Sequence, residues 1–380
     1  MREPGGSGPV LTAGAPISWG VCEVPGWGRQ LDRSRVLAEM RELGLTATEL
    51  GPDGFLPPSP TRCRSLLAEY GLRAVGGFVP VVLHEADHDP LPVVRAAMRA
   101  FMDGEVDVVV LAASTGGESY DARPELDAAA WKILMGNLRR ILKNAKEFGR
   151  TVTLHPHIGT VVENREEVQR VLDDSSMPLC LDTGHLLAGG TDPAELVSRA
   201  AGRIAHVHLK DVDAAMAGRV RAGELTYTQA VKDGLYLPLG RGDVDLPAIV
   251  GGLTRAGYDG WYVLEQDVVL GPSDGDAGSG GPMENVRESL AYLRNLTGDE
   301  TGPPGGGAPG HGVPGHGGSG GGEPGSGVTG NGGPKSDGPE SGVPGHGGPG
   351  GDGSGSGGPG SDGSGSGGPG SGGPPGGGRA

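Results

Sequence analysis

The sequence predicts a (β/α)8 barrel, the TIM-barrel fold, over residues 10–298. Short apolar segments alternate with amphipathic helical segments along this stretch, and eight such pairs in about 290 residues suit one closed barrel. The apolar segments are continuous runs, which is typical of parallel strands covered on both faces. No glycine-rich dinucleotide fingerprint follows the first segment, which argues against an open, doubly wound sheet.

The expected elements follow one another in order along the chain. Strands are expected at residues 10–19, 46–50, 74–82, 106–112, 151–154, 178–181, 204–209 and 261–265. Helices are expected at residues 34–43, 61–70, 92–102, 128–148, 165–172, 193–201, 246–256 and 283–296. Gly44, Gly71 and Gly149 come directly after three of these helices, where glycine suits the left-handed residue that ends a helix.

The two ends of the chain are expected to lie outside the barrel. Of the 380 residues, 77 are glycine and 32 are proline, and the excess lies in the C-terminal segment. Such a composition has too little apolar surface to offset the loss of chain entropy on folding. We therefore predict a flexible N-terminus at residues 1–9 and a disordered, low-complexity Gly/Pro/Ser-rich tail at residues 299–380.

Charge and cysteine content limit the partners and the compartment. The formal net charge of -16 predicts no nucleic-acid partner and no membrane partner, because phosphates and anionic headgroups repel an acidic surface. Cys22, Cys63 and Cys180 are too few for a disulfide framework, which favours a reducing cytoplasm. Residues 1–9 lack the apolar segment of a signal peptide, and no apolar run is long enough to span a bilayer. We expect a cytoplasmic location.

Polar residues gather where the predicted strands end, which is where TIM barrels carry their active sites. They are Trp19, Glu49, His84, His155, His157, Asp182, His185, His206, His208, Lys210 and Glu265. Carboxylates and imidazoles at one rim are the ligands that Mn, Co, Fe or Zn ions take. We expect only one of His206 and His208 to enter the barrel mouth. His155 and His157 are two residues apart and are expected to share a face of their strand.

Three of these segments resemble a known superfamily. The turn Asp182-Thr183-Gly184-His185, the strand His206-Val207-His208-Leu209-Lys210-Asp211 and Glu265 are similar to the xylose-isomerase-like TIM barrels. Members typically hold a metal with Glu, Asp, His and Glu. The resemblance implies that Asp182, His208 and Glu265 are three of the ligands. The fourth position, usually glutamate, falls on His155, with His157 as the alternative.

Further segments resemble the inosose dehydratase branch of that superfamily, also called 2-keto-myo-inositol dehydratases. These are residues 15–20, 48–51, 155–160, 239–245 and 260–267, and the resemblance extends over residues 10–297. It implies a hydro-lyase of inositol catabolism that removes water from a small cyclic polyhydroxy ketone, scyllo-inosose, through a metal-stabilised enolate. The cofactor it implies is a divalent metal ion, Mn or Co first, with Zn, Fe or Mg as alternatives.

Roles for the remaining residues follow from this chemistry. His157, His185 and Lys210 are the acid–base and substrate-orienting candidates, with a solvated rim position as the alternative for Lys210. Trp19 and Glu49 are candidate substrate contacts, as an apolar wall and a hydroxyl acceptor; the alternatives are barrel packing and a strand-end cap. His84 is a third substrate candidate, with a surface loop position as its alternative.

Three other functions compete with dehydration. A ketose isomerase or epimerase of the same superfamily would use related chemistry and return the proton elsewhere. A metal-dependent endonuclease would need a basic groove, against which the charge of -16 argues. A non-catalytic polyol-binding protein would keep the barrel without a stoichiometric metal. The sequence leaves the oligomeric state open, a homo-oligomer included.

Overall fold

Eight parallel strands close into a barrel in the computed structural model, which describes residues 10–117, 119–274 and 281–298. The hydrogen-bonded order is β1-β10-β7-β6-β5-β4-β3-β2, closing back on β1. The barrel strands are β1 (Thr12–Gly14), β2 (Ala47–Glu49), β3 (Arg73–Val82), β4 (Val108–Ser114), β5 (Thr151–Leu154), β6 (Leu179–Asp182), β7 (Ile204–Leu209) and β10 (Tyr262–Leu264). The predicted TIM barrel is confirmed.

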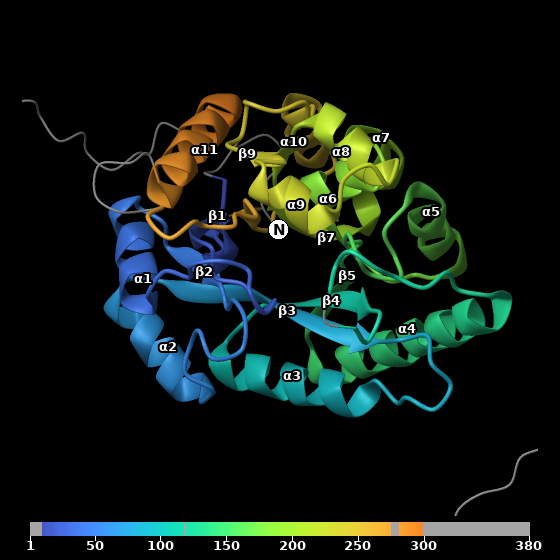
Figure 1. Ribbon diagram of the computed structural model, residues 1–380. Helices are drawn as coiled ribbons and strands as arrows, with labels where there is room; N and C mark the ends of the chain where they lie inside the picture. The colour runs from blue at the N-terminus through green and yellow to red at the C-terminus, as the bar shows by residue number, and fades with distance from the viewer. Residues whose placement is uncertain (1–9, 118, 275–280, 299–380) are drawn as a thin grey trace, which may run out of the picture. The chain divides into compact units, whose positions relative to one another are not determined.

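Helices surround this ring of strands (Figure 1). The predicted ones are α1 (Arg33–Glu42), α2 (Pro60–Glu69), α3 (Leu91–Gly104), α4 (Ala128–Phe148), α5 (Arg165–Asp174), α7 (Pro193–Ala200), α10 (Leu246–Arg255) and α11 (Pro282–Thr297). Local signals set their ends. Asn164 and Glu167 form a reciprocal capping box at the start of α5, and Gly149 ends α4 in the left-handed conformation.

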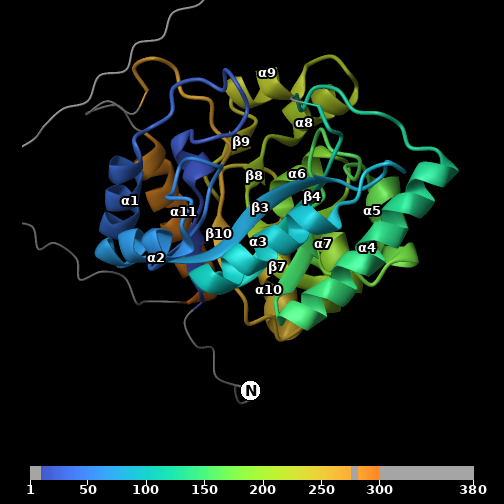
Figure 2. The same cartoon turned by 90° about the horizontal axis from the view of Figure 1, so that it is seen from below.

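The long connection after β7 contains structure that the sequence pattern did not predict. It forms α8 (Ala214–Arg221), α9 (Tyr227–Lys232) and a small antiparallel pair, β8 (Asp211–Val212) with β9 (Tyr236–Leu237). Figure 2 shows α8, α9 and β9 gathered at one end of the barrel. A short helix, α6 (Thr183–Ala188), also follows β6 directly, and a 3-10 turn, η2 (Ala201–Arg203), precedes β7.

The first predicted strand is shorter than expected. β1 ends at Gly14, and residues Pro16–Trp19 form a 3-10 helix, η1. Pro16 explains the change, because proline has no N–H for a sheet ladder and its fixed φ suits the first turn of a helix.

The predictions about the chain ends and the compartment concern residues that the structure describes only in part. The predicted flexible N-terminus at residues 1–9 and the predicted tail at residues 299–380 lie outside the described residues. Among the residues that are described, no helix is long and apolar enough to cross a membrane. Cys22, Cys63 and Cys180 are all buried and free, as the cysteine count predicted.

Candidate metal centre and active site

The inner faces of the barrel strands change from apolar to polar toward their carboxyl ends. Ala47 and Val263 belong to a small buried apolar cluster inside the barrel. Two residues further along the same strands, on the same face, come Glu49 and Glu265. On β6 and β7 the corresponding steps lead from Cys180 to Asp182 and from His206 to His208, and these residues pair across the two strands. On β2 and directly after β10 a carboxylate therefore lies above an apolar residue, whereas on β7 both positions are histidines.

The four residues predicted as metal ligands are brought together in this layer. His155 Nε2 lies 3.3 Å from Asp182 Oδ2, which lies 3.4 Å from His208 Nδ1. His208 Nδ1 lies 2.5 Å from Glu265 Oε2. All four atoms are buried, and none of them has a hydrogen bond of acceptable geometry. Buried polar atoms are normally satisfied, so four orphans facing one another fit a divalent cation with two nitrogen and two oxygen ligands.

The first turn of α6 fixes the orientation of the Asp182 carboxylate. Asp182 is the N-cap of that helix, and its Oδ1 accepts a hydrogen bond from the backbone N–H of His185 at 2.8 Å. Its Oδ2 is thereby turned toward the other ligands. Gly184 is required in the same turn, because a Cβ there would lie 2.6 Å from Cβ of Lys210. The Asp-Thr-Gly-His motif thus combines a helix cap, a candidate ligand and a glycine that makes room for Lys210.

Lys210 lies fully buried beside the ligands. Its Nζ is 2.8 Å from Asp267 Oδ1, 3.0 Å from His185 Nε2 and 3.3 Å from Asp182 Oδ2. Burial opposes the charge, but the carboxylates of Asp182 and Asp267 raise the pKa of Lys210 well above its ordinary value. Lys210 is therefore an ammonium group inside the barrel, and its alternative as a solvated rim lysine is wrong.

His155 and His157 have different surroundings although both lie inside the mouth, 5.2 Å apart between ring centroids. Burial lowers the pKa of His155 to about 4, and neither of its ring nitrogens has a hydrogen-bond partner. His157 donates from Nδ1 to the carbonyl of Ile158 at 2.6 Å, and its ring stacks on His185 with centroids 3.7 Å apart. Burial, followed by His185, also lowers the pKa of His157 well below its ordinary value, so both imidazoles are neutral.

One carboxylate oxygen of Glu49 is engaged by two histidines. Its Oε1 accepts hydrogen bonds from Nε2 of His206 at 2.7 Å and from Nε2 of His208 at 2.9 Å. The expectation that only one of these histidines enters the barrel is wrong. Residues two apart on a strand share a face, and β7 turns both rings inward.

Trp19 and His84 lie apart from the ligand cluster. Trp19 is fully buried in the main hydrophobic core, and its Nε1 donates to Glu39 Oε2 on α1 at 2.7 Å. This is the barrel-packing alternative rather than a wall of the mouth. His84 is half-buried after β3, with burial lowering its pKa, and makes no described contact with the ligands.

Five residues of the site were not predicted from the sequence. Asp267 accepts from Lys210 and from the hydroxyl of Tyr227, which lies 2.9 Å from its Oδ2. The Tyr236 hydroxyl lies 3.2 Å from His185 Nδ1. Phe78 and Tyr120 place their rings 5.7 and 4.8 Å from the ring of His157. Asp267 was open to prediction, because it lies two residues after Glu265. Tyr227 and Tyr236 belong to α9 and β9 in the connection after β7, Phe78 lies within β3 and Tyr120 in a loop, and none of these four has a local signal.

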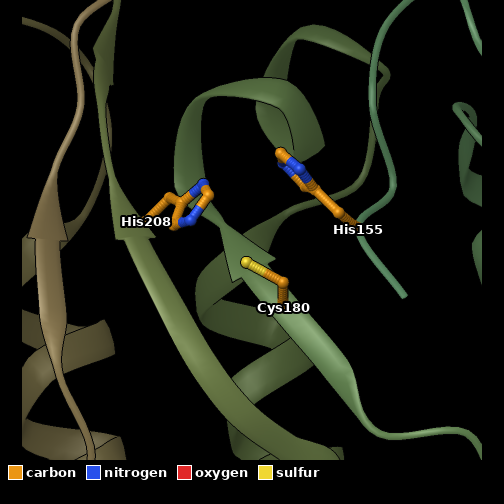
Figure 3. A group of neighbouring side chains, drawn as sticks. All are labelled: His155, Cys180 and His208. Carbon is orange, nitrogen blue, oxygen red and sulfur yellow. The ribbon is translucent and has the colours of Figure 1, made fainter. Parts of the chain in front are cut away.

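Cys180 lies below the two histidine ligands (Figure 3). Its side chain, from β6, lies close to those of His155, directly after β5, and His208, on β7, and the three have ligand atoms within 4.8 Å of one another. Burial raises the pKa of the Cys180 thiol to about 11, so the thiol is neutral. The four unsatisfied atoms above it remain the candidate ligands.

A closed parallel barrel with imidazoles, carboxylates and a buried lysine at its strand ends defines a (β/α)8 protein with an enzyme-like polar centre. The chain belongs to the xylose isomerase-like TIM barrel family, whose model matches residues 37–296. The predicted superfamily is thereby confirmed.

Named relatives refine this picture. The chain is 34% identical over 266 residues to an inosose dehydratase of Geobacillus kaustophilus, covering 67% of this chain and 86% of that protein. It is 33% identical over 261 residues to the rhizopine catabolism protein MocC of Rhizobium meliloti, covering 66% of this chain and 80% of that protein. The IolI protein, solved with a bound zinc atom, shares the fold at a TM-score of 0.55 and 15% identity, over 76% of this chain and 98% of that one.

Proposed function

We propose that this protein is a metal-dependent hydro-lyase that removes water from a cyclic polyhydroxy ketone, with scyllo-inosose as the substrate. The observation that carries the proposal is the set of four buried, unsatisfied ligand atoms beside a buried lysine and two further histidines. The relatives named as inosose dehydratases support the choice of reaction.

His155, Asp182, His208 and Glu265 would hold the ion. Burial opposes a charge on His208, but the carboxylates of Glu265 and Glu49 raise the pKa of His208 well above its ordinary value, so this place favours positive charge. Mixed imidazole and carboxylate ligands suit Mn or Co, as well as the zinc named for the IolI structure. A bound divalent ion would act as a Lewis acid on the ketone oxygen of the substrate.

His157 is the residue we assign to proton removal from the carbon beside the ketone. Its Nδ1–H is fixed by the carbonyl of Ile158, which leaves Nε2 as the unprotonated nitrogen. Burial keeps the ring neutral, and the stacked ring of His185 fixes its plane. A neutral, oriented imidazole is a suitable general base.

Lys210 is the residue we assign to the departing hydroxyl, together with His185. In the elimination, the electron pair of the broken C–H bond forms the C=C bond, and the C–O bond of the neighbouring carbon breaks. The leaving hydroxyl takes one proton and departs as water. The ammonium of Lys210 carries such a proton, and Asp267 and Tyr227 hold it in place from behind.

The test is incubation of the purified protein with scyllo-inosose and a panel of ketoses, with Mn²⁺ or Co²⁺ and after chelation. We expect product mass to show loss of one water from scyllo-inosose, only with the metal. A product of unchanged mass would identify an isomerase or epimerase instead, and in D2O it would carry deuterium. Protein that binds no stoichiometric metal and turns over none of the substrates would instead favour a non-catalytic polyol-binding protein.

We also propose that the chain works in the cytoplasm on small polyols or keto-sugars, without nucleic-acid or membrane partners. Three free, buried cysteines and the net charge of -16 support this setting.

A further inference from the structure

Glu49 reaches across the inside of the barrel. It stands at the end of β2, and its two partners, His206 and His208, stand on β7; β1 and β10 lie between these strands in the barrel order. All three side chains are at most about one-twentieth exposed, with Glu49 at 5% and each histidine at 1%. The contact is therefore a long-range hydrogen-bonded cluster closed off from solvent.

The barrel wall makes room for this cluster. At Gly76 on β3, a Cβ would lie 2.6 Å from Glu49 Oε1 and 3.2 Å from His206 Nε2. Any other residue at this position would displace the carboxylate. Glycine in the strand therefore has a local reason, the close approach of a side chain that serves β7.

The two hydrogen bonds determine which nitrogen of His208 is free. A carboxylate only accepts, so Nε2 of both histidines must carry the hydrogen. In the neutral ring of His208, Nδ1 is then the unprotonated nitrogen, and this is the atom that faces Asp182 Oδ2 and Glu265 Oε2. A neutral imidazole with its lone pair on Nδ1 is the form that binds a metal.

We propose that Glu49 is a positioning residue that fixes the ring orientation and tautomer of His208 for metal binding, with His206 holding the carboxylate from below. This inference rests on the proposed metal centre. Carboxylate–histidine–metal arrangements of this kind typically change metal affinity by 10- to 100-fold when the carboxylate is removed. Glu49, His206 and His208 could also hold an ion of their own, but their facing atoms already satisfy one another.

The test compares Glu49→Gln with Glu39→Gln in the full-length protein. Glu39 is a matched control, because it also accepts from an aromatic ring N–H, that of Trp19, but lies on α1 outside the barrel. We expect competition with a chelator to show Co²⁺ binding about 10- to 100-fold weaker in Glu49→Gln and unchanged in Glu39→Gln. Glu49→Leu, which accepts nothing, serves as a second variant if the first does not fold.

Ring nitrogen NMR on the metal-free protein provides a readout that a general loss of structure would not give. At a pH where the His208 ring is neutral, the wild type is expected to show the hydrogen on Nε2, and Glu49→Gln a mixture of both tautomers. Wild-type protein that binds no ion would overturn the proposed function, while the tautomer shift would still test the role of Glu49. Equal Co²⁺ affinity and equal tautomers in both variants, or two ions per chain, would overturn this inference alone.

Discussion

Asp182 and Asp211 are both buried carboxylates that lie next to the ends of neighbouring strands, β6 and β7, yet their surroundings differ completely. Asp211 Oδ1 accepts from the backbone N–H groups of Val212 and Val244, and its Oδ2 accepts from those of Gly240 and Gly242. Asp182 accepts one backbone N–H at Oδ1 and has no hydrogen bond at Oδ2.

This difference separates a structural carboxylate from a candidate metal ligand. Asp211 ties the loop after β9 to the barrel and has no acceptor capacity left on either oxygen for a ligand. Gly242 belongs to that arrangement, because a Cβ there would lie 2.3 Å from Asp211 Oδ1. Asp182 keeps Oδ2 without a hydrogen bond inside the protein, beside the ammonium of Lys210 and the other candidate ligand atoms. Asp182 and Asp211 are the same residue type and both lie near the end of a strand. Only their hydrogen bonds distinguish them.

The largest effect is expected for Asp182→Ala. It removes a ligand and a helix cap together, so metal content and turnover should fall below detection. Asp192→Ala is the matched control, because Asp192 caps α7 in the same way and contacts no ligand. It should cost about 1 kcal/mol of stability and leave metal and turnover unchanged. Full metal content in the Asp182 variant, measured by elemental analysis, would contradict the site.

Asp211→Asn should show the opposite pattern. Its amide can accept on one side only and turns N–H groups toward backbone donors, so the free energy of unfolding should fall by about 3 kcal/mol. Thermal unfolding measures this loss, and metal content per folded molecule should stay at the wild-type level. A variant that melts normally but loses its metal would show that Asp211, too, belongs to the site.

The sequence was sufficient for the barrel and for selecting candidate ligands that the fold brings together, because both depend on local patterns. Continuous apolar runs, glycine stops and capping residues lie within a few positions of each element, and α4, β5 and β7 have the bounds that were predicted. Strand ends meet at one rim in any closed parallel barrel, which is why Asp182, His208 and Glu265 could be selected together.

The remaining contacts depend on atoms far apart in the chain. Glu49 meets His208 from a position 159 residues away, and Tyr227 meets Asp267 across 40 residues in a connection with no repeating pattern. The prediction that Trp19 lines the substrate pocket was wrong for a similar reason. Nothing near it in the sequence shows that the 3-10 turn at Pro16 directs its ring toward α1 instead of the mouth.

The next largest effects are expected for the two histidines after β5, whose replacement should change different quantities. His155→Ala should lower metal affinity, since both ring nitrogens of His155 lack other partners. His157→Ala should retain metal and lower turnover by about 100-fold or more, the usual scale for a general base. Metal analysis beside steady-state kinetics on both variants distinguishes them. Normal metal and normal turnover in both would make these histidines structural and weaken the choice of dehydratase over isomerase.

The smallest effect is expected for Trp19→Phe. The ring of Trp19 is buried, and phenylalanine fills most of its volume, so the main loss is the hydrogen bond from Nε1 to Glu39 Oε2. That loss should lower the free energy of unfolding by about 1 kcal/mol and leave KM for the substrate unchanged. Glu39→Gln keeps an acceptor for the indole N–H and should cost less than Trp19→Phe in thermal unfolding. If KM rose several-fold in Trp19→Phe while stability held, the indole would be acting on the substrate, and the boundary between core and mouth would have to be moved to include η1.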